Sequence, residues 1–527
     1  MAKALPWWQR GAIYQLLVPS FFDTNSDGMG DLPGVTQKLE YLQWLGVEAI
    51  WLSPIYASPL EDLGYDVSDF TDIEPRFGTL ADFEDLMRAA HGRGLKVILD
   101  WIPNHTSSEH TWFQGARSSR EHPLRDWYIW RDPKPDGSPP NNWLSIFGGS
   151  VWEFDEATGQ YYLHTFLKEQ PDLNWSHPDV QEAVLEAMRF WLDRGIDGFR
   201  LDALDLLTKD PRFPDNPPNP NYNPEFDGPD MAVLPTYTRD QPAVHDVVAT
   251  MRRLVDEYQD RVLLGELYLP IDQIIAFYGG EEPELHLPLQ PVFGSLPWIA
   301  EELYKLIDPY LGQMPENAWP SWMLSTHDGR RVASRAGAAQ APVAAMMLLT
   351  LPGTPIIYYG DEIGMHDVEV PPEKERDPQG KRIGRKRDPV RTPMQWNDWV
   401  QAGFTSGEPW LPVADDYEAT NVDDQSEARS LLTLYRRLLS FRREIPTLVS
   451  GSFVLDAPRE RIISYRREDD ERRLLILLNL GSEPQTVELD DQDGRNRVLL
   501  STFHDRENEE VENAFEVRGD EGLILTT

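Results

Sequence analysis

The sequence predicts an α/β fold: a (β/α)8 TIM barrel with an inserted subdomain after its third strand and a C-terminal antiparallel β-sandwich domain. Three observations support this prediction. Amphipathic helical segments and nearly continuous apolar strands alternate along most of the chain, as in a parallel sheet covered by helices. A long stretch rich in Trp, Pro, Asn and Gly interrupts the alternation after the third strand. From about residue 450, short strands with alternating polarity take over.

The eight barrel strands are expected where short apolar runs follow amphipathic helices that end at glycine. The segment 178–194, for example, places Val180 and Val184 on one helix face, ends at Gly195 and leads into the strand 198–204. The predicted barrel strands are residues 11–21, 47–54, 95–102, 198–204, 261–267, 285–293, 322–325 and 353–359.

The same patterns predict the domain boundaries. The barrel is expected to comprise residues 1–104 and 175–447, with a loop subdomain at about 365–424. Residues 105–174 are expected to form a second domain, domain B, and residues 448–527 the C-terminal β-domain. The strands predicted for that last domain are 452–455, 462–466, 473–480, 486–489, 497–500 and 523–525.

Composition excludes several classes of partner and of chemistry. A formal charge of −39 would repel nucleic acids and anionic membranes. The chain has no cysteine, so disulfides and thiol chemistry are excluded, and any metal must be held by oxygen or imidazole. No apolar run reaches the roughly 18 residues of a membrane span, and the first ten residues lack the apolar segment of a secretory signal. We therefore expect a cytoplasmic protein, monomeric or weakly self-associating; whether its acidity reflects a saline habitat stays open.

Polar residues follow the ends of several predicted strands. Because the carboxyl ends of barrel strands converge, these residues are expected to form one site. Arg200 and Asp202 share a strand face, and a neighbouring guanidinium should keep Asp202 ionised. Glu266 follows an apolar run, which should raise its pKa. The full set is Tyr65, Asp66, His105, Arg200, Asp202, Glu266, His327 and Asp328.

Seven motifs carry a resemblance to a known family. Taken in order, they resemble glycoside hydrolase family 13, the α-amylase superfamily of retaining α-glycosidases, over nearly the whole chain. G-Y-D-V, Q-P-D-L-N and R-T-P-M-Q-W are similar to those of its oligo-1,6-glucosidase and α-glucosidase branch. The motifs are G-Y-D-V (64–67), D-W-I-P-N-H (100–105), Q-P-D-L-N (170–174), G-F-R-L-D-A (198–203), L-L-G-E-L (263–267), L-S-T-H-D (324–328) and R-T-P-M-Q-W (391–396).

The resemblance implies roles for the strand-end residues. Asp202 would be the nucleophile, Glu266 the general acid/base and Asp328 the residue that stabilises the transition state. A retaining mechanism implies carboxyl groups about 5–5.5 Å apart and a covalent glycosyl-enzyme. Asp66 and Arg391 would grip the non-reducing end of the substrate, and Tyr65 would stack under its ring. The implied substrate contacts are Tyr65, Asp66, His105, Arg200, Ala203, His327 and Arg391.

Two departures from the family pattern stand out. Thr326 replaces the usual asparagine of the seventh-strand motif and is expected to point away from the sugar. The stretch 286–293 does not match the usual sixth-strand motif, which leaves that part of the pocket wall unpredicted. The basic run 381–391 is interpreted as a solvated loop, except for Arg391.

The implied activity is that of an exo-acting α-glucosidase, which hydrolyses terminal α-1,4-linked glucose from short oligosaccharides such as maltose and can transfer glucose to other acceptors. By resemblance, alanine at position 203 favours α-1,4 cleavage, whereas valine there accompanies α-1,6 cleavage. Oligo-1,6-glucosidase, sucrose hydrolase or isomerase, and trehalose synthase remain alternatives. A non-catalytic sugar-binding or transporter-associated relative is a further one, against which the three intact carboxylates count.

A second motif predicts a metal site. Oxygen-bearing residues alternate along the loop after the first strand, as in the first half of an EF-hand loop, although the glutamate that closes an EF-hand is absent. The loop resembles the calcium loop of the same family branch, which implies a structural Ca²⁺; Mg²⁺ and a metal-free turn remain alternatives. The implied ligands are Asp23, Asn25, Asp27, Asp31 and the Met29 carbonyl.

Overall fold

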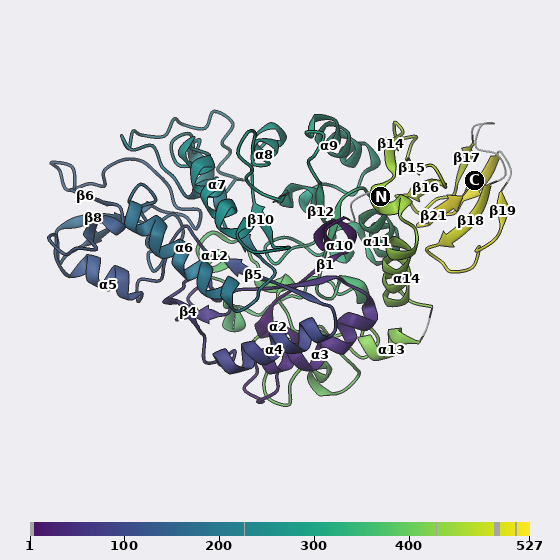
Figure 1. Cartoon of the computed structure of the whole chain (residues 1–527), viewed down its shortest axis with the longest axis horizontal. Helices are drawn as coiled ribbons and strands as arrows, with labels where there is room; N and C mark the ends of the chain where they lie inside the picture. The colour runs from purple at the N-terminus through teal and green to yellow at the C-terminus, as the bar shows by residue number, and fades with distance from the viewer. Residues whose placement is uncertain (1–4, 226, 428, 490–495, 512–513, 527) are drawn as a thin grey trace.

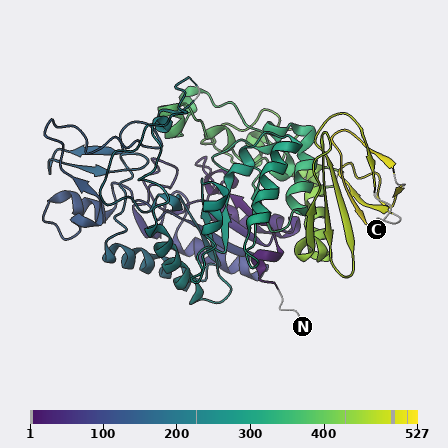
Figure 2. The ribbon, with the colours of Figure 1, turned by 90° about the horizontal axis from the view of Figure 1, so that it is seen from above.

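The computed structural model describes residues 5–225, 227–427, 429–489, 496–511 and 514–526. Along the long axis of the molecule, the barrel lies between two smaller parts (Figure 1). The elements of residues 105–174 form one end and the C-terminal strands form the other. The view from above shows the same order (Figure 2).

The barrel contains all eight predicted strands, each somewhat shorter than its apolar run. The first run, for instance, divides at Pro19 into β1 and the short helix α2 (Val18–Phe21). The parallel sheet has the order β11-β10-β9-β5-β2-β1-β13-β12. The barrel strands are β1 (Ile13–Leu16), β2 (Ala49–Leu52), β5 (Lys96–Trp101), β9 (Gly198–Leu201), β10 (Val262–Glu266), β11 (Leu287–Leu289), β12 (Ser321–Met323) and β13 (Thr354–Tyr358).

The barrel closes between β11 and β12 without a backbone ladder. Pro288, in the middle of β11, has no N–H group to donate to a neighbouring strand. A side chain bridges the gap instead, because the Ser321 hydroxyl donates to the Pro288 carbonyl at 2.9 Å. The eight strands therefore form a nearly closed barrel.

Strand alternation divides the apolar side chains of the barrel between two layers. In β2, Ala49 and Trp51 belong to the cluster that fills the barrel interior, together with Val262 and Leu264 of β10. Ile50 and Leu52 belong instead to the large core between strands and helices. The strands that carry the polar groups at their carboxyl ends are thus packed on both faces, against the barrel interior and against the helices.

Helices cover the outside of the barrel. Thr79 caps α4 through the capping box predicted by its spacing from Asp82, and Asp31 caps α3 by accepting the Gly34 N–H. The main covering helices are α3 (Leu32–Leu45), α4 (Leu80–Gly92), α6 (Pro178–Asp193), α7 (Ala243–Asp256), α8 (Ile271–Ala276), α9 (Ala300–Gln313), α10 (Val332–Ala336), α11 (Ala341–Thr350) and α14 (Leu431–Glu444).

The segments after β5, β9 and β13 stand over the carboxyl ends of the barrel strands. Residues 105–174 contain a helix and a small sheet: α5 (Thr111–Ser118), β6 (Trp130–Arg131), β7 (Trp152–Asp155) and β8 (Gln160–Leu163). The proline-rich segment after β9 contains the 3-10 turn η3 (Pro229–Ala232). The segment after β13 contains α12 (Pro378–Ile383) and α13 (Val422–Ser426).

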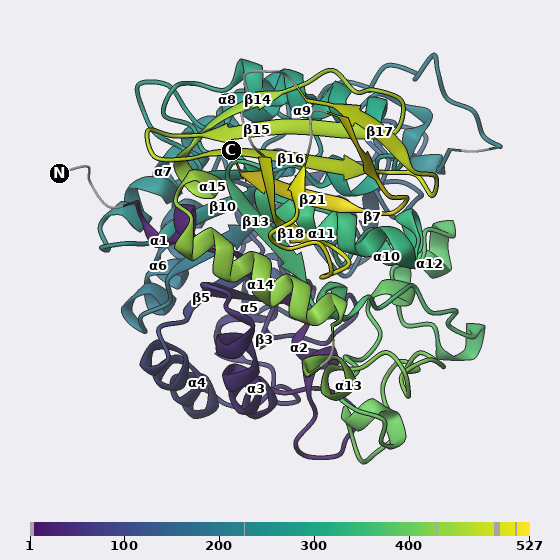
Figure 3. The same cartoon turned by 90° about the vertical axis from the view of Figure 1, so that its right-hand side faces the viewer.

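The C-terminal domain pairs a six-stranded antiparallel sheet with a two-stranded one (Figure 3). Within β16, Leu475 and Leu477 face the two-stranded sheet, whereas Leu474 and Ile476 join the core shared with the barrel helices. All six predicted strands are present, and the weakly patterned β19 and β20 were not predicted. The strands are β14 (Ser452–Leu455), β15 (Ile462–Glu468), β16 (Arg473–Asn479), β17 (Gln485–Glu488), β18 (Asn496–Ser501), β19 (Glu510–Val511), β20 (Ala514–Val517) and β21 (Gly522–Thr526).

Candidate active site

A cavity of about 870 Å³ lies at the carboxyl ends of the barrel strands, under the long loops. Most of the strand-end residues predicted from the sequence converge here. Asp66, Arg200 and Arg391 do not line the cavity and are buried behind its wall. The predicted residues that do line it are Tyr65, His105, Asp202, Ala203, Glu266, His327 and Asp328.

Strand register brings Asp202 and Glu266 together. β9 and β10 pair in parallel with Leu201 opposite Gly265, so Asp202 and Glu266 follow at the same level. A Cβ atom at position 265 would come within 2.5 Å of a Leu285 methyl group and 2.8 Å of a Leu204 methyl group. Gly265 therefore allows the close packing beneath Glu266.

Arg200 holds three carboxylates with one guanidinium. Its Nη1 donates to Asp202 and to Asp100, each at 2.7 Å, and its Nη2 lies 2.6 Å from Glu266. Asp100 is directly opposite Arg200 on the neighbouring strand β5, and both side chains are fully buried. Arg200 thus holds the carboxylates from behind the cavity wall.

Two of the three predicted catalytic carboxyl groups, those of Asp202 and Glu266, have raised pKa values. Burial raises the pKa of Glu266 to about 7, and Arg200 offsets this only in part. Burial also raises the pKa of Asp202 well above its ordinary value, against the opposing effect of Arg200. Arg200 is shared among three carboxylates, so it offsets the effect of burial on the pKa of each of them only in part.

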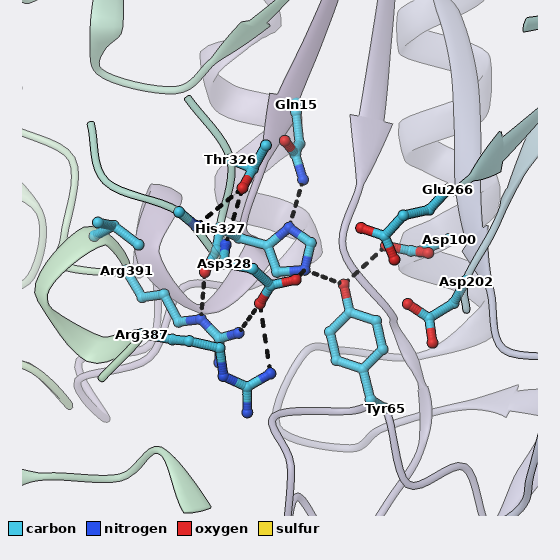
Figure 4. Close-up of polar contacts among 12 residues, drawn as sticks. Gln15, Tyr65, Asp100, Asp202, Glu266, Thr326, His327, Asp328, Arg387 and Arg391 are labelled. Atoms are coloured by element: carbon cyan, nitrogen blue, oxygen red, sulfur yellow. Dashed lines mark hydrogen bonds and ion pairs between the residues drawn. The ribbon is translucent and has the colours of Figure 1, made fainter. Parts of the chain in front are cut away.

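Asp328 has the opposite electrostatic environment. Arg391 donates to its Oδ1 at 2.8 Å, and Arg387 lies 3.4 Å from the same atom (Figure 4). Burial favours the neutral acid, but His327 and the two arginines outweigh it and hold the pKa of Asp328 well below its ordinary range. Burial also lowers the pKa of His327 to about 3, so the two guanidinium groups supply the positive charge that keeps Asp328 ionised at neutral pH.

His327 is held by three polar partners. Its Nδ1 lies 2.8 Å from the Gln15 amide nitrogen, and its Nε2 lies 2.8 Å from the Tyr65 hydroxyl and 3.2 Å from Asp328 (Figure 4). The Tyr65 and His327 rings are nearly parallel, with centroids 5.6 Å apart. The Tyr65 hydroxyl also donates to Asp100 at 3.0 Å. This network fixes a flat wall of the cavity.

His105, the first residue of the predicted domain B, lies on the cavity wall. Its Nε2 is 2.9 Å from the Tyr65 carbonyl and 3.2 Å from the Gln170 amide nitrogen, and burial lowers its pKa. Gln170 also lines the cavity. It belongs to the Q-P-D-L-N motif, but the motif alone assigned it no role.

Asp66 is not a cavity residue, contrary to the sequence-based expectation. Its carboxylate is fully buried and accepts hydrogen bonds from the Ser58 hydroxyl and from the backbone N–H groups of Glu61 and Asp62. Asp66 therefore shapes the turn that presents Tyr65. The carboxylates of Asp62 and Asp66 both lie in the short D-L-G-Y-D stretch, and sequence alone did not distinguish which of the two reaches the cavity.

Asp62 and Arg387 occupy the cavity wall instead. Arg387 Nη2 lies 2.6 Å from Asp62 Oδ1 and 2.7 Å from Asp377, and both Asp62 and Arg387 line the cavity. Arg387 is 7% exposed, so the interpretation of the run 381–391 as a solvated loop is wrong at this residue. Arg391 lies behind it, where its Nε donates to the His327 carbonyl at 2.9 Å. Arg391 thus orients Asp328 and His327.

Ala203 combines cavity exposure with an unusual backbone conformation. It lines the cavity directly after Asp202 and adopts φ 47° and ψ 39°, the left-handed region. For residues other than glycine this region costs about 1–2 kcal/mol, and a β-branched side chain fits it poorly. The backbone conformation therefore disfavours a β-branched residue at this position.

The two departures from the family motifs lie away from the cavity wall. The Thr326 hydroxyl accepts the backbone N–H groups of Asp328 and Gly329, so it supports the turn below the cavity. This agrees with the expectation that Thr326 points away from a sugar. Residues 286–293 do not line the cavity, and His286 accepts the Leu263 N–H at 3.0 Å behind the sheet.

The loop after β1 is organised by its own side chains. Asp23 accepts the N–H groups of Asn25, Ser26 and Gly28, and Asp27 accepts the Met29 N–H. The candidate metal ligands in this loop are all oxygen atoms, as a hard divalent cation requires. Among the residues that the structure describes, however, no group of three or more His, Asp or Glu side chains is arranged to hold a metal ion. Calcium binding therefore stays a prediction.

No helix in the described part of the chain combines the length and apolar character needed to cross a membrane.

Comparison with known proteins agrees with this geometry. The sequence model of the α-amylase catalytic domain matches residues 15–451. An oligo-1,6-glucosidase from Parageobacillus thermoglucosidasius is 37% identical over an alignment of 551 positions that covers 96% of each chain. Maltase A1 from Drosophila melanogaster is 39% identical, over 92% of this chain and 89% of its own.

The crystal structure of XgtA, described as an alpha-glucosyl transfer enzyme, matches with a TM-score of 0.93 at 38% identity, covering 99% of this chain and 100% of that one. The family model spans most of the chain, these relatives align along most of their length, and Asp202, Glu266 and Asp328 meet in one cavity. The protein is therefore a glycoside hydrolase of family 13, the α-amylase family, and belongs to its α-glucosidase branch.

Proposed function

We propose that the protein is an exo-acting, retaining α-glucosidase that removes terminal α-1,4-linked glucose from short oligosaccharides such as maltose. The observation that carries the proposal is the ion pair between Asp62 and Arg387 on the cavity wall. Arg387 lies on the opposite side of Asp328 from Glu266 (Figure 4). Charged hydrogen-bonding groups at this end of the cavity suit the hydroxyls of a terminal sugar. They would leave no room for the oligosaccharide to extend beyond that sugar.

In the proposed mechanism, Asp202 attacks the anomeric carbon while Glu266 gives its proton to the departing glycosidic oxygen. A pKa of about 7 keeps much of Glu266 protonated at neutral pH, as a general acid requires. The sugar ring gains positive charge in the transition state, which favours ionised Asp202, and Asp328 adds a permanent negative charge.

The second half of the mechanism uses the same two groups. Ionised Glu266 removes a proton from water, the water oxygen attacks the anomeric carbon, and the bond to Asp202 breaks. A sugar hydroxyl that replaces water gives a new glucoside, so transfer of glucose follows from the same intermediate. The alpha-glucosyl transfer activity named for XgtA supports this part of the proposal.

The proposed preference for α-1,4 linkages rests on Ala203, the residue after the nucleophile. Ala203 leaves more space beside Asp202 than valine would, which supports α-1,4 cleavage by the family resemblance. Maltase A1 and the oligo-1,6-glucosidase are about equally similar to the chain, so overall similarity does not favour either linkage.

The test is to incubate the purified protein with maltose, isomaltose, sucrose and trehalose and to follow glucose and new products by chromatography. Maltose cleaved well ahead of isomaltose is the expected result. Faster cleavage of isomaltose would assign the enzyme to α-1,6 linkages, and conversion of sucrose or maltose into an isomer would make it an isomerase or synthase. If none of the four sugars changed, the glucosidase proposal itself would fail.

A further inference from the structure

Gln15 is a polar residue on the inner face of the barrel strand β1. Ile13, two residues earlier on the same strand face, belongs to the apolar cluster inside the barrel. Gln15 is 2% exposed and does not line the catalytic cavity. Its amide nitrogen lies 2.8 Å from Nδ1 of His327, and among the described residues its side chain makes no other hydrogen bond. Burial of an amide is costly, so this single contact suggests a role that involves His327.

The direction of the hydrogen bonds around His327 follows from Asp100, at the far end of the network. Arg200 donates to Oδ1 of Asp100 at 2.7 Å, and the indole N–H of Trp51 donates to Oδ2 at 3.3 Å. Arginine and tryptophan side chains can only donate, so both oxygens of Asp100 are acceptors. The Tyr65 hydroxyl, 3.0 Å from Oδ2, therefore gives its single hydrogen to Asp100.

The position of the His327 proton follows from this direction. The Tyr65 oxygen is 2.8 Å from Nε2 of His327 and has no hydrogen left to give, so Nε2 must carry the hydrogen. Burial lowers the pKa of His327 to about 3, so the neutral ring has only this one proton. Nδ1 is then an acceptor, and Gln15 donates its amide N–H to it. Gln15, His327 and Tyr65 thus donate in turn toward Asp100 (Figure 4).

A second ring proton would alter the charge beside Asp328. Nε2 lies 3.2 Å from Oδ2 of Asp328, so an imidazolium at this position would pair with that carboxylate. The second proton would have to bind Nδ1, whose lone pair already accepts the Gln15 N–H. Protonation would therefore require the amide to turn over and this hydrogen bond to be lost. Asp328 favours the imidazolium, whereas burial and the positive charges of Arg391, Arg200 and Arg387 oppose it.

We propose that Gln15 is a positioning residue that acts through His327: it keeps the ring neutral, with its one proton on Nε2, so that Asp328 presents its full negative charge to the sugar. The inference deepens the proposed glucosidase function and rests on it. In that mechanism the sugar ring becomes positive in the transition state, and an imidazolium next to Asp328 would weaken the stabilisation. Gln15 itself lies behind the cavity wall and contacts no substrate or reacting atom.

The first measurement is ¹⁵N NMR of the protein labelled at histidine, with the His327 signal identified by its loss in His327→Asn. In the wild type, the His327 ring should carry a proton on Nε2 alone from about pH 5 to pH 8, the range in which an ordinary histidine titrates. Gln15→Glu keeps the side-chain length but offers Nδ1 a carboxylate, so the ring should gain a second proton at neutral pH. Gln15→Met, of similar length and without a hydrogen-bonding group, should leave the ring neutral.

The kinetics of the same two variants test the consequence for catalysis. Gln15→Glu should lower kcat/KM for maltose about 100-fold, and mainly through kcat, because the charge on Asp328 matters most in the transition state. Gln15→Met should lower it about tenfold at most, the cost of one lost hydrogen bond. Equal losses in the two variants, with a neutral His327 ring in both, would show a merely structural role and overturn the proposal.

A second buried glutamine provides the control for stability. Gln340 accepts the Trp298 indole N–H at 2.8 Å and donates to the Asn479 carbonyl in the C-terminal domain. Gln340→Met should therefore lower the melting temperature without changing the His327 signal or kcat/KM. If Gln15→Glu fails to fold, the wild-type spectrum decides: a proton on Nδ1, or titration of the ring between about pH 5 and pH 8, would overturn the proposal.

The results also separate this inference from the proposed function, because the NMR measurement needs no substrate. A wild type that cleaves no α-glucoside would refute the proposed function, and with it the catalytic part of this inference. Full activity on maltose in a Gln15→Glu variant whose His327 ring is doubly protonated would refute the role of Gln15 alone.

Discussion

The two sides of the catalytic cavity are built from different kinds of residue. On the side that would hold the terminal glucose, Asp62, Arg387 and Asp328 form a mostly buried chain of ion pairs. On the leaving-group side, Met231 and Tyr268 are apolar or aromatic and roughly two-fifths exposed. Charged groups with several fixed partners have little freedom to adapt, whereas exposed apolar groups tolerate varied shapes. The comparison predicts strict recognition of glucose and broad tolerance of what leaves or accepts it.

The largest expected effect is that of removing the proposed proton donor, Glu266, which lies between the two sides. Glu266→Gln should lower kcat/KM for maltose by about 10²–10⁴-fold. p-Nitrophenyl α-glucoside should lose less activity, because its leaving group needs little protonation. In the wild type, Glu266 with a pKa of about 7 loses its proton as the pH rises. Activity should therefore fall above about pH 7, and full activity of the variant on maltose would contradict the assignment.

The next effect tests the charged side and the correction from Asp66 to Asp62. Asp62→Asn leaves Arg387 with one fewer carboxylate partner and removes a cavity contact, so kcat/KM should fall on the order of 100-fold. Asp66→Asn is the matched control in the same turn. It should lower the melting temperature, because its carboxylate accepts buried hydrogen bonds, and change kcat/KM no more than about threefold. The opposite ranking would restore Asp66 to the binding site.

A smaller effect is expected at the point where the two sides meet. Ala203→Val places a β-branched residue at φ 47°, which should cost stability on the order of 1–2 kcal/mol. It should also reduce the preference for maltose over isomaltose about tenfold, since one methylene group can discriminate by that much. Ala203→Gly, which adopts this conformation readily, should keep the preference without loss of stability. An unchanged preference in the valine variant would show that other wall residues decide linkage.

The smallest effect is expected at the loop after β1, which contacts the segment that carries the charged side of the cavity. Asp23 accepts the Thr405 hydroxyl at 2.5 Å, and Thr405 belongs to the segment after β13 that also carries Arg387. If the loop binds calcium, EDTA should lower the melting temperature by about 1 °C for each kcal/mol of lost stabilisation and leave KM for maltose nearly unchanged. Asp27→Ala should abolish the response. If neither EDTA nor added Ca²⁺ changed the melting temperature, the loop would be a metal-free turn held by its own hydrogen bonds.

Residues on the strands themselves were the most predictable. Asp202 and Glu266 each follow a short apolar run, and parallel strands of a barrel bring such positions to one rim. Side-chain alternation likewise placed Arg200 on the same strand face as Asp202. The capping box of Thr79 and Asp82 is a local pattern, and it forms as predicted.

Residues that depend on distant loops were not predictable in this way. Asp62 and Arg387 are 325 residues apart in the chain and meet only because the loops after β2 and β13 fold over the same rim. The basic run around Arg387 has the composition of a solvated surface, and burial of that residue arises from Asp62 and Asp377.

By itself, then, the sequence determined the barrel, its family and the proposed catalytic carboxylates, because these depend on local periodicity and on short motifs at strand ends. Only the tertiary structure decided which carboxylate of the D-L-G-Y-D stretch reaches the cavity and how one guanidinium is shared among Asp100, Asp202 and Glu266. Protonation and burial depend on all the groups that surround a site. Those groups come from segments whose mutual approach no local pattern encodes.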